Sequence, residues 1–201
     1  MEINQAIDAI VELYAIPLAS VSSPYIDCKT LDNKKVAVLV EDVYQEMEVW
    51  YPAYRIREAG HKTVFVGTGK PEYKSKLGYP VKSEADIKEV KSKDFDGLIV
   101  PGGFAPDFLR RSPEVLQFVA DLDKAGKPIG SICHAAWVLV SAKILSGRTA
   151  TCYFAIKDDV INAGAKYVDQ EVVVDRNLVT SRRPDDLPAF MREFLKVLGP
   201  K

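Results

Sequence analysis

The chain has 201 residues, of which 47% are hydrophobic and 27% charged, and its 27 basic and 28 acidic side chains leave a formal net charge of -1. A chain of this length can bury a sizeable core as one domain. Its charge balance excludes a nucleic acid or a membrane surface as a partner held by charge, and no apolar run approaches the ~20 residues of a membrane helix. Three scattered cysteines without a CxxC pair predict a reducing, cytoplasmic setting.

The first 33 residues differ in pattern from the rest. Apolar residues at helical spacing predict a short helix over residues 3–14. Residues 15–33 contain prolines and serines and predict an irregular connector. We therefore expect an N-terminal extension, residues 1–33, followed by one α/β domain, residues 34–201.

Strands and helices alternate through the predicted domain. Apolar runs predict buried strands over residues 35–40, 63–66, 97–100 and 128–132, with a shorter strand at 79–81. Amphipathic spacing and end signals predict helices over residues 47–59, 112–125, 135–145 and 184–198. A hairpin is predicted over residues 172–179. Near-continuous apolar strands between helices are typical of a mostly parallel sheet covered by helices on both faces.

Cys133 lies where a predicted strand joins a predicted helix. A sharp turn there would lift its side chain towards a helix N-terminus, which favours an anion and hence the thiolate nucleophile. The turn needs small neighbours, and the sequence supplies Gly130, Ser131, Ala135 and Ala136. The alternative is a buried structural cysteine, because cysteine also packs as a small hydrophobic residue.

Three strand ends are expected to meet at Cys133, because ligands of such folds bind beyond the carboxyl ends of the strands. The first strand leads into residues 41–48, the third into residues 101–103, and the fourth ends at Cys133 itself. Glycine after a strand lets main-chain N–H groups face a ligand. Gly103 and His134 could therefore supply two N–H donors to an oxyanion.

Several segments, in order, carry a specific family resemblance between Lys35 and Leu198. They are Pro101–Gly103, Lys127–His134, Gly147–Arg148, Ala155–Gly164, Glu171–Asp175, Val179–Arg182 and Pro184–Ala189. Together they resemble the PfpI-type intracellular protease family of the Parkinsonism-associated deglycase superfamily, which has a class I glutamine-amidotransferase-like fold. The resemblance implies a flavodoxin-like three-layer α/β sandwich with a small β-hairpin, no cofactor, and assembly as a homo-oligomer, either a dimer or a hexamer.

The resemblance also implies the site residues. Cys133 matches the nucleophile and His134 the neighbouring catalytic histidine. Glu48 matches a glutamate that hydrogen-bonds the cysteine, and Tyr153 matches a tyrosine that lines the pocket. Asp107 stands where protease members carry a glutamate that reaches the histidine of a neighbouring subunit.

The sequence departs from the family pattern at two positions that matter. Gln45 replaces a first glutamate found in many members, which weakens any scheme that needs two carboxylates from that loop. Asp107 is one methylene shorter than the family's glutamate, so a triad across the subunit boundary would have less reach.

Each candidate also has a structural interpretation. His134 could be an ordinary residue at a helix start, because adjacent side chains on a helix diverge, and Glu48 could be a solvated carboxylate. Cys152 is expected in the core, and His61 on the surface or at a helix cap. Two histidines make a poor metal constellation, so no catalytic metal is expected.

Two classes of function remain open. The first is a cofactor-independent cysteine enzyme that hydrolyses peptides or converts small 2-oxoaldehydes such as methylglyoxal, in the manner of a glyoxalase III or a deglycase. In this chemistry we expect Glu48 to be protonated and Cys133 ionised at neutral pH. The second class is a stress-protective chaperone or redox sensor in which Cys133 is oxidised instead of turning over substrate.

Overall fold

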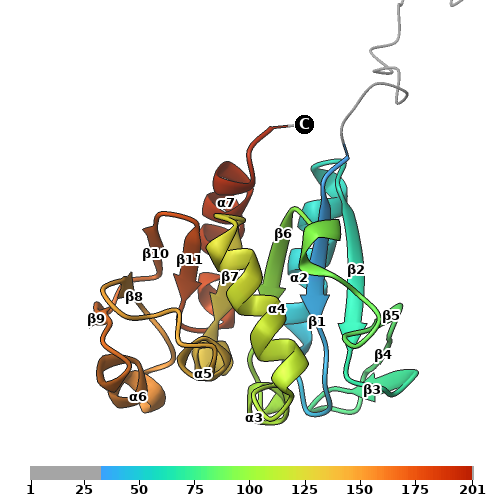
Figure 1. Ribbon diagram of the computed structural model, residues 1–201, viewed down its shortest axis with the longest axis horizontal. Coiled ribbons are helices and arrows are strands. Elements are labelled where there is room, and N and C mark those ends of the chain that lie inside the picture. The colour runs from blue at the N-terminus through green and yellow to red at the C-terminus, as the bar shows by residue number, and fades with distance from the viewer. Residues whose placement is uncertain (1–32, 201) are drawn as a thin grey trace, which may run out of the picture. The chain divides into compact units, whose positions relative to one another are not determined.

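A computed structural model describes residues 33–200, so the predicted helix over residues 3–14 and nearly all of the connector after it lie outside the described residues. The described chain forms a seven-stranded sheet between two layers of helices (Figure 1). Its strands are β1 (Lys35–Leu39), β2 (Lys62–Gly67), β5 (Ala85–Asp86), β6 (Gly97–Val100), β7 (Ile129–Ile132), β10 (Val172–Asp175) and β11 (Leu178–Ser181). The helices are α2 (Glu46–Glu58), α3 (Ala105–Leu109), α4 (Pro113–Lys124), α5 (Ala136–Ser141), α6 (Lys157–Asn162) and α7 (Leu187–Leu198).

The sheet has the order β10-β11-β7-β6-β1-β2-β5, and every neighbouring pair is parallel except β10 and β11. The four predicted buried strands and the predicted α/β sandwich are confirmed. The predicted hairpin, β10 and β11, extends this sheet because β11 pairs in parallel with β7. Parallel pairing brings the carboxyl ends of β1, β6 and β7 to one edge, where ligands of such folds bind.

Alternate residues of the central strand β1 fill two separate cores, as the period of a strand requires. Val36 and Val38 face the core that contains α2 and α7, whereas Ala37 and Leu39 face the core of α4 and α5. This explains why β1 reads as an uninterrupted apolar run. Figure 1 shows the two helical layers on opposite faces of the sheet.

The helices α2 and α4 follow the predicted end signals. The side chain of Gln45 caps α2, and Gly60 follows its end with a φ of 81°. The Ser112 side chain caps α4 by accepting the N–H of Val115. Gly60 and Ser112 are the predicted end signals, whereas the cap formed by Gln45 was not predicted.

Two predicted helices are shorter than expected. Residues 133–135 form a 3-10 turn, and the α-helix after it ends at Ser141. The last helix is likewise preceded by the 3-10 turn Pro184–Asp186.

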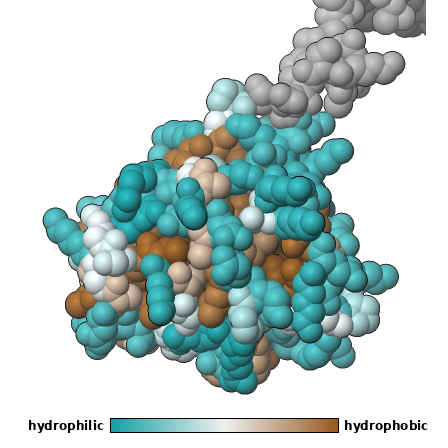
Figure 2. All heavy atoms as spheres, in the orientation of Figure 1, coloured by the Kyte–Doolittle hydropathy of each residue, from teal (hydrophilic) through white to brown (hydrophobic). Residues whose placement is uncertain are grey.

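Some short elements escape the sequence analysis because they are too short to carry a period. They are α6, β5, the strand β3 (Glu72–Lys74), and the parallel pair β8 (Thr149–Ala150) and β9 (Lys166–Tyr167). The shorter strand predicted at residues 79–81 is present as β4 (Pro80–Lys82), which pairs with β3 in a hairpin. On the face seen in Figure 2, hydrophilic residues predominate, with smaller hydrophobic areas between them. In the described part of the chain, no helix is long and apolar enough to span a membrane.

Candidate active site

Cys133 occupies a strained turn directly after β7. Its φ is 62°, a left-handed conformation that is uncommon for a residue other than glycine. The side chain is 7% exposed, so the thiol lies at the bottom of the turn and not on the surface. Backbone strain of this kind persists only where the surrounding structure imposes it, and such residues cluster at functional sites.

Glu48 reaches Cys133 from the first turn of α2. Gly102, which follows β6, donates its N–H to Glu48 Oε2 at 2.7 Å. A Cβ at Gly102 would lie 2.7 Å from both Glu48 Oε2 and Cys133 Cβ. Only glycine therefore allows these groups to approach so closely, and the three expected strand ends do meet.

Burial controls the charge of Glu48. The residue is fully buried, and this burial raises the pKa of its carboxyl to about 7. The hydrogen bond from the Gly102 N–H lowers the pKa, but by less than burial raises it. Oε1 is buried without a regular hydrogen-bond partner among the described residues. Glu48 is therefore not a solvated carboxylate, and near neutral pH it can either give or take a proton.

The Cys133 thiol is less acidic than the sequence indicates. Burial raises the pKa of Cys133 to about 12, and the negative charge of Glu48 acts in the same direction. The N–H groups of Gly103 and His134 point towards the sulfur and lower this pKa, but by less. The expectation of a thiol acidified by a helix N-terminus is wrong, because α5 has only six residues and the thiol is shielded from water.

His134 contacts the thiol of its own neighbour in sequence, because the left-handed turn at Cys133 brings the two side chains together. Its Nδ1 lies 3.2 Å from Cys133 Sγ. The ring stacks on Tyr153 at 4.7 Å and meets Trp137 edge-on at 5.2 Å. Burial lowers the pKa of His134, so the imidazole is neutral at pH 7 and can accept a proton from the thiol.

A cavity of about 470 Å³ opens above Cys133. It is lined by Val43, Gln45, Lys76, Gly103, Phe104, Cys133, His134, Trp137, Tyr153 and Pro184. The predicted residues Gly103, His134 and Tyr153 thus share one cavity with Cys133. Among the lining residues that the structure describes, Lys76 alone carries a permanent charge. Sequence reasoning missed it because it stands in a lysine-rich segment with no motif around it.

Asp107 lies outside the lining of this cavity. It belongs to the short helix α3 and forms an ion pair with Arg111 of the same chain. Its predicted contact with the histidine of a neighbouring subunit stays a prediction. His61 is buried and does not lie on the surface. It takes the expected capping position, because its backbone N–H donates to the Ile56 carbonyl at the end of α2. Cys152 is buried, as expected for a core residue.

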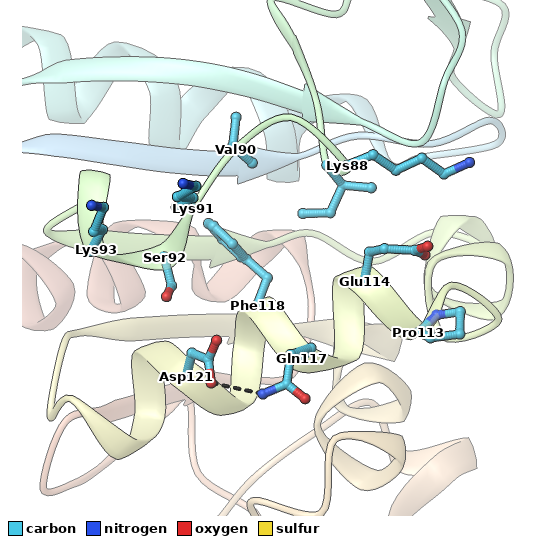
Figure 3. Close-up of a pocket in the computed structure, with 11 residues that line it drawn as sticks. Lys88, Val90, Lys91, Ser92, Lys93, Pro113, Glu114, Gln117, Phe118 and Asp121 are labelled. Carbon is cyan, nitrogen blue, oxygen red and sulfur yellow. Dashed lines mark hydrogen bonds between the residues drawn. The ribbon is translucent and has the colours of Figure 1, made fainter.

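A second hollow, of about 650 Å³, lies between the segment 87–93 and α4 (Figure 3). Lys88, Lys91 and Lys93 line it from the segment and Glu114 and Asp121 from the helix, where Gln117 donates to Asp121 at 2.8 Å. It shares no lining residue with the Cys133 cavity and contains neither cysteine nor histidine. Within residues 33–200, no three His, Cys, Asp or Glu side chains gather as metal ligands. The Cys133 cavity is therefore the candidate active site.

The fold and this site define an α/β protein with a cysteine on a nucleophile elbow. The sequence model of the DJ-1/PfpI family matches residues 34–197, and the chain belongs to this family. It is 41% identical over 164 residues to "Deglycase PfpI" of Pyrococcus furiosus, which covers 82% of this chain and 99% of the relative. It is 44% identical to "Protein/nucleic acid deglycase 2" of Escherichia coli and to "Putative cysteine protease YraA" of Bacillus subtilis, with 83% of this chain and 99% of each relative covered.

Solved structures share the fold. DJ-1beta of Drosophila melanogaster superposes with a TM-score of 0.79 at 28% identity, covering 84% of this chain and 92% of that one. A two-domain protein of Anabaena variabilis, with DJ-1/ThiJ/PfpI-like and ferritin-like domains, gives a TM-score of 0.81 at 37% identity. The present chain, 84% of which is covered, spans about half of that longer protein.

Proposed function

We propose that this protein is a cofactor-independent cysteine enzyme that converts 2-oxoaldehydes such as methylglyoxal, and groups glycated by them, to 2-hydroxy acids. The observation that carries the proposal is the buried carboxyl of Glu48, with a pKa of about 7, beside the Cys133 thiol. A carboxyl of this pKa moves protons efficiently near neutral pH. The deglycase relatives, at 41% and 44% identity, support the same substrate class.

The first step is addition of the thiol to the aldehyde carbon. Cys133 Sγ forms the S–C bond, and His134 Nδ1, 3.2 Å away, takes the thiol proton and passes it to the aldehyde oxygen. The product is a hemithioacetal. Neutral His134 is needed here because the thiol holds its proton until substrate arrives. The N–H groups of Gly103 and His134 stabilise the developing oxyanion.

The second step moves a proton between adjacent carbons. Ionised Glu48 removes the proton of the hemithioacetal carbon, which gives an enediol, and returns it to the neighbouring former carbonyl carbon. The hydroxyl proton of the hemithioacetal passes to the former ketone oxygen, so that the product is a 2-hydroxy thioester of Cys133. Water then cleaves the S–C bond, so that methylglyoxal plus water yields lactate and the free thiol. No oxidant or reductant is required, because the aldehyde carbon is oxidised as the ketone carbon is reduced.

Peptide hydrolysis is the second candidate, supported by His134 beside the thiol and by the relative with a cysteine-protease name. It requires His134 to protonate a leaving amine, and an acid that orients the imidazole. We propose Asp107 of a neighbouring subunit for that role, within a cytoplasmic homo-oligomer. The oxidation-sensor alternative receives less support, because burial keeps Cys133 protonated and oxidation follows thiolate character.

The deciding experiment measures lactate formed from methylglyoxal beside casein hydrolysis, in the protein and in Cys133→Ala. We expect Cys133→Ala to lose all turnover, whereas Cys152→Ser, which alters a buried thiol outside the cavity, serves as the matched control and stays active. Turnover that persists in purified Cys133→Ala would refute the mechanism. A protein with no turnover, in which Cys133 is readily oxidised, would favour the sensor.

A further inference from the structure

Gln45 presents an unused donor to the cavity. Its Oε1 accepts the N–H groups of Met47 at 2.6 Å and of Glu48 at 3.2 Å, which fixes the orientation of the amide. The opposite end of the amide, Nε2, has no acceptor among the described residues, although Gln45 is only 5% exposed and lines the cavity. Because Oε1 is held by two backbone N–H groups, Nε2 is a donor of fixed orientation at the wall of the cavity, where it can bond a ligand oxygen.

Lys76 adds a positive charge to the same cavity. It lies in the loop between β3 and β4, and its side chain lines the cavity together with Gln45. No ion pair joins its ammonium group to a carboxylate in residues 33–200, and the nearby Glu46 is hydrogen-bonded to the Leu77 N–H at 2.8 Å instead. The charge of Lys76 acts on both Glu48 and His134, which places it within electrostatic reach of the reacting groups.

We propose that Gln45 and Lys76 form a carboxylate-binding subsite, so that the preferred substrates are 2-oxoaldehydes that carry a carboxylate. This inference rests on the proposed function and names its substrate class. The other lining residues within 33–200 are uncharged, and aromatic side chains supply much of the wall, so a negative group has one place to bind among them. Gln45 supplies a directed hydrogen bond and Lys76 the charge, a combination suited to a carboxylate.

The turnover test compares methylglyoxal with 4,5-dioxopentanoate, a 2-oxoaldehyde with a terminal carboxylate, which would yield 2-hydroxyglutarate. We expect kcat/KM to favour the anionic substrate. Lys76→Met should lower the anionic-to-neutral ratio about tenfold, the worth of one charge-assisted hydrogen bond. Lys82→Met, an exposed lysine of the same hairpin outside the cavity, is the matched control for the lost charge and should keep the ratio.

Gln45→Glu tests the donor without removing the helix cap, because a carboxylate oxygen can still accept the N–H groups of Met47 and Glu48. The variant exchanges a donor for a negative charge at the same place. We expect the anionic-to-neutral ratio to fall at least as far as in Lys76→Met. An unchanged ratio in both variants would overturn the subsite even if both substrates are converted.

A second readout needs no turnover. Iodoacetate and iodoacetamide alkylate Cys133 and differ by one negative charge, so the ratio of their rates reports an anion subsite directly. We expect the rate of alkylation by iodoacetate, divided by the rate with iodoacetamide, to fall in Lys76→Met and Gln45→Glu but not in Lys82→Met. A protein that converts neither aldehyde but shows this fall would contradict the proposed reaction and support the subsite. Equal rate ratios in all proteins would refute the subsite.

Discussion

Glu48 shows how one buried side chain couples catalysis to stability. Its carboxyl loses the solvation of water and gains the Gly102 N–H together with the thiol of Cys133. The pKa rises from 4.5 to about 7, so between these values the folded protein binds more protons than the unfolded chain. The free energy of unfolding therefore falls with rising pH across this window.

Glu48→Gln cannot ionise, so it removes the cost of holding a charged carboxylate in the buried site above pH 7. We expect the variant to be more stable than the parent above pH 7, by up to about 3 kcal/mol for the shift from 4.5 to about 7. The advantage should vanish below pH 4.5, where both states of the parent are protonated. Urea unfolding at pH 4 and pH 8 measures it, and an equal difference at both pH values would contradict the assignment.

The same variant also tests the chemistry. Turnover of methylglyoxal should be lost, and the alkylation inflection of Cys133 should move to lower pH, because the charge of Glu48 raises the pKa of the thiol. An inflection that moves upward would mean that the protonated carboxyl, as expected from sequence, dominates instead.

At the scale of elements, the loop between β1 and α2 carries strain beside the site. Val43 has a φ of 62°, which is unfavourable for a β-branched residue. Its N–H donates to the Lys74 carbonyl at 2.7 Å, and its carbonyl accepts the N–H of Phe104 at 2.9 Å. These two bonds tie the loop to β3 and to the turn before α3, and so hold the rim of the cavity in place.

Replacing Val43 by asparagine, which tolerates the left-handed region, should raise the free energy of unfolding by about 1 kcal/mol. The side chain is 39% exposed, so little packing is lost. Val174→Asn is the control, since Val174 is 43% exposed but lies in the strand β10 with no positive φ. That change should lower stability. Chemical denaturation measures the free energy of unfolding of both variants. A lower value for Val43→Asn than for the parent protein would contradict the strain argument.

At the scale of the whole molecule, an aromatic surface supports the proposed homo-oligomer. Trp50 meets Tyr54 at 5.9 Å and Tyr79 at 5.8 Å. Tyr54, Tyr79 and Leu77 are 59%, 58% and 83% exposed. Together with Met47 they line a hollow of about 730 Å³ between α2 and the β3–β4 hairpin. Exposed apolar patches of this kind favour contact with another protein surface.

Tyr54→Glu should therefore shift the protein towards monomer in light scattering, because it places a charge on this surface without touching the core. If the peptidase site needs Asp107 from a neighbouring subunit, both Tyr54→Glu and Asp107→Ala should lose casein hydrolysis. Methylglyoxal turnover, which uses Cys133 and Glu48 of one chain, should fall far less. A monomeric parent protein, or Asp107→Ala with intact peptidase activity, would refute the intersubunit triad.

The sequence by itself determined the buried strands, the helices α2 and α4, and the position of Cys133 at the end of β7, because each depends on local periodicity, local hydrogen bonding or a contiguous motif. It also placed Glu48 and Gly103 near Cys133, since parallel strands end at one edge of a sheet. Only the tertiary structure decided the protonation of the site. Burial raises the pKa of both Glu48 and Cys133, and burial depends on every element packed around them. The position of Lys76 in the cavity wall was also decided by the tertiary structure, because it depends on the pairing of β3 with β4, and the sequence predicted only the second of these strands.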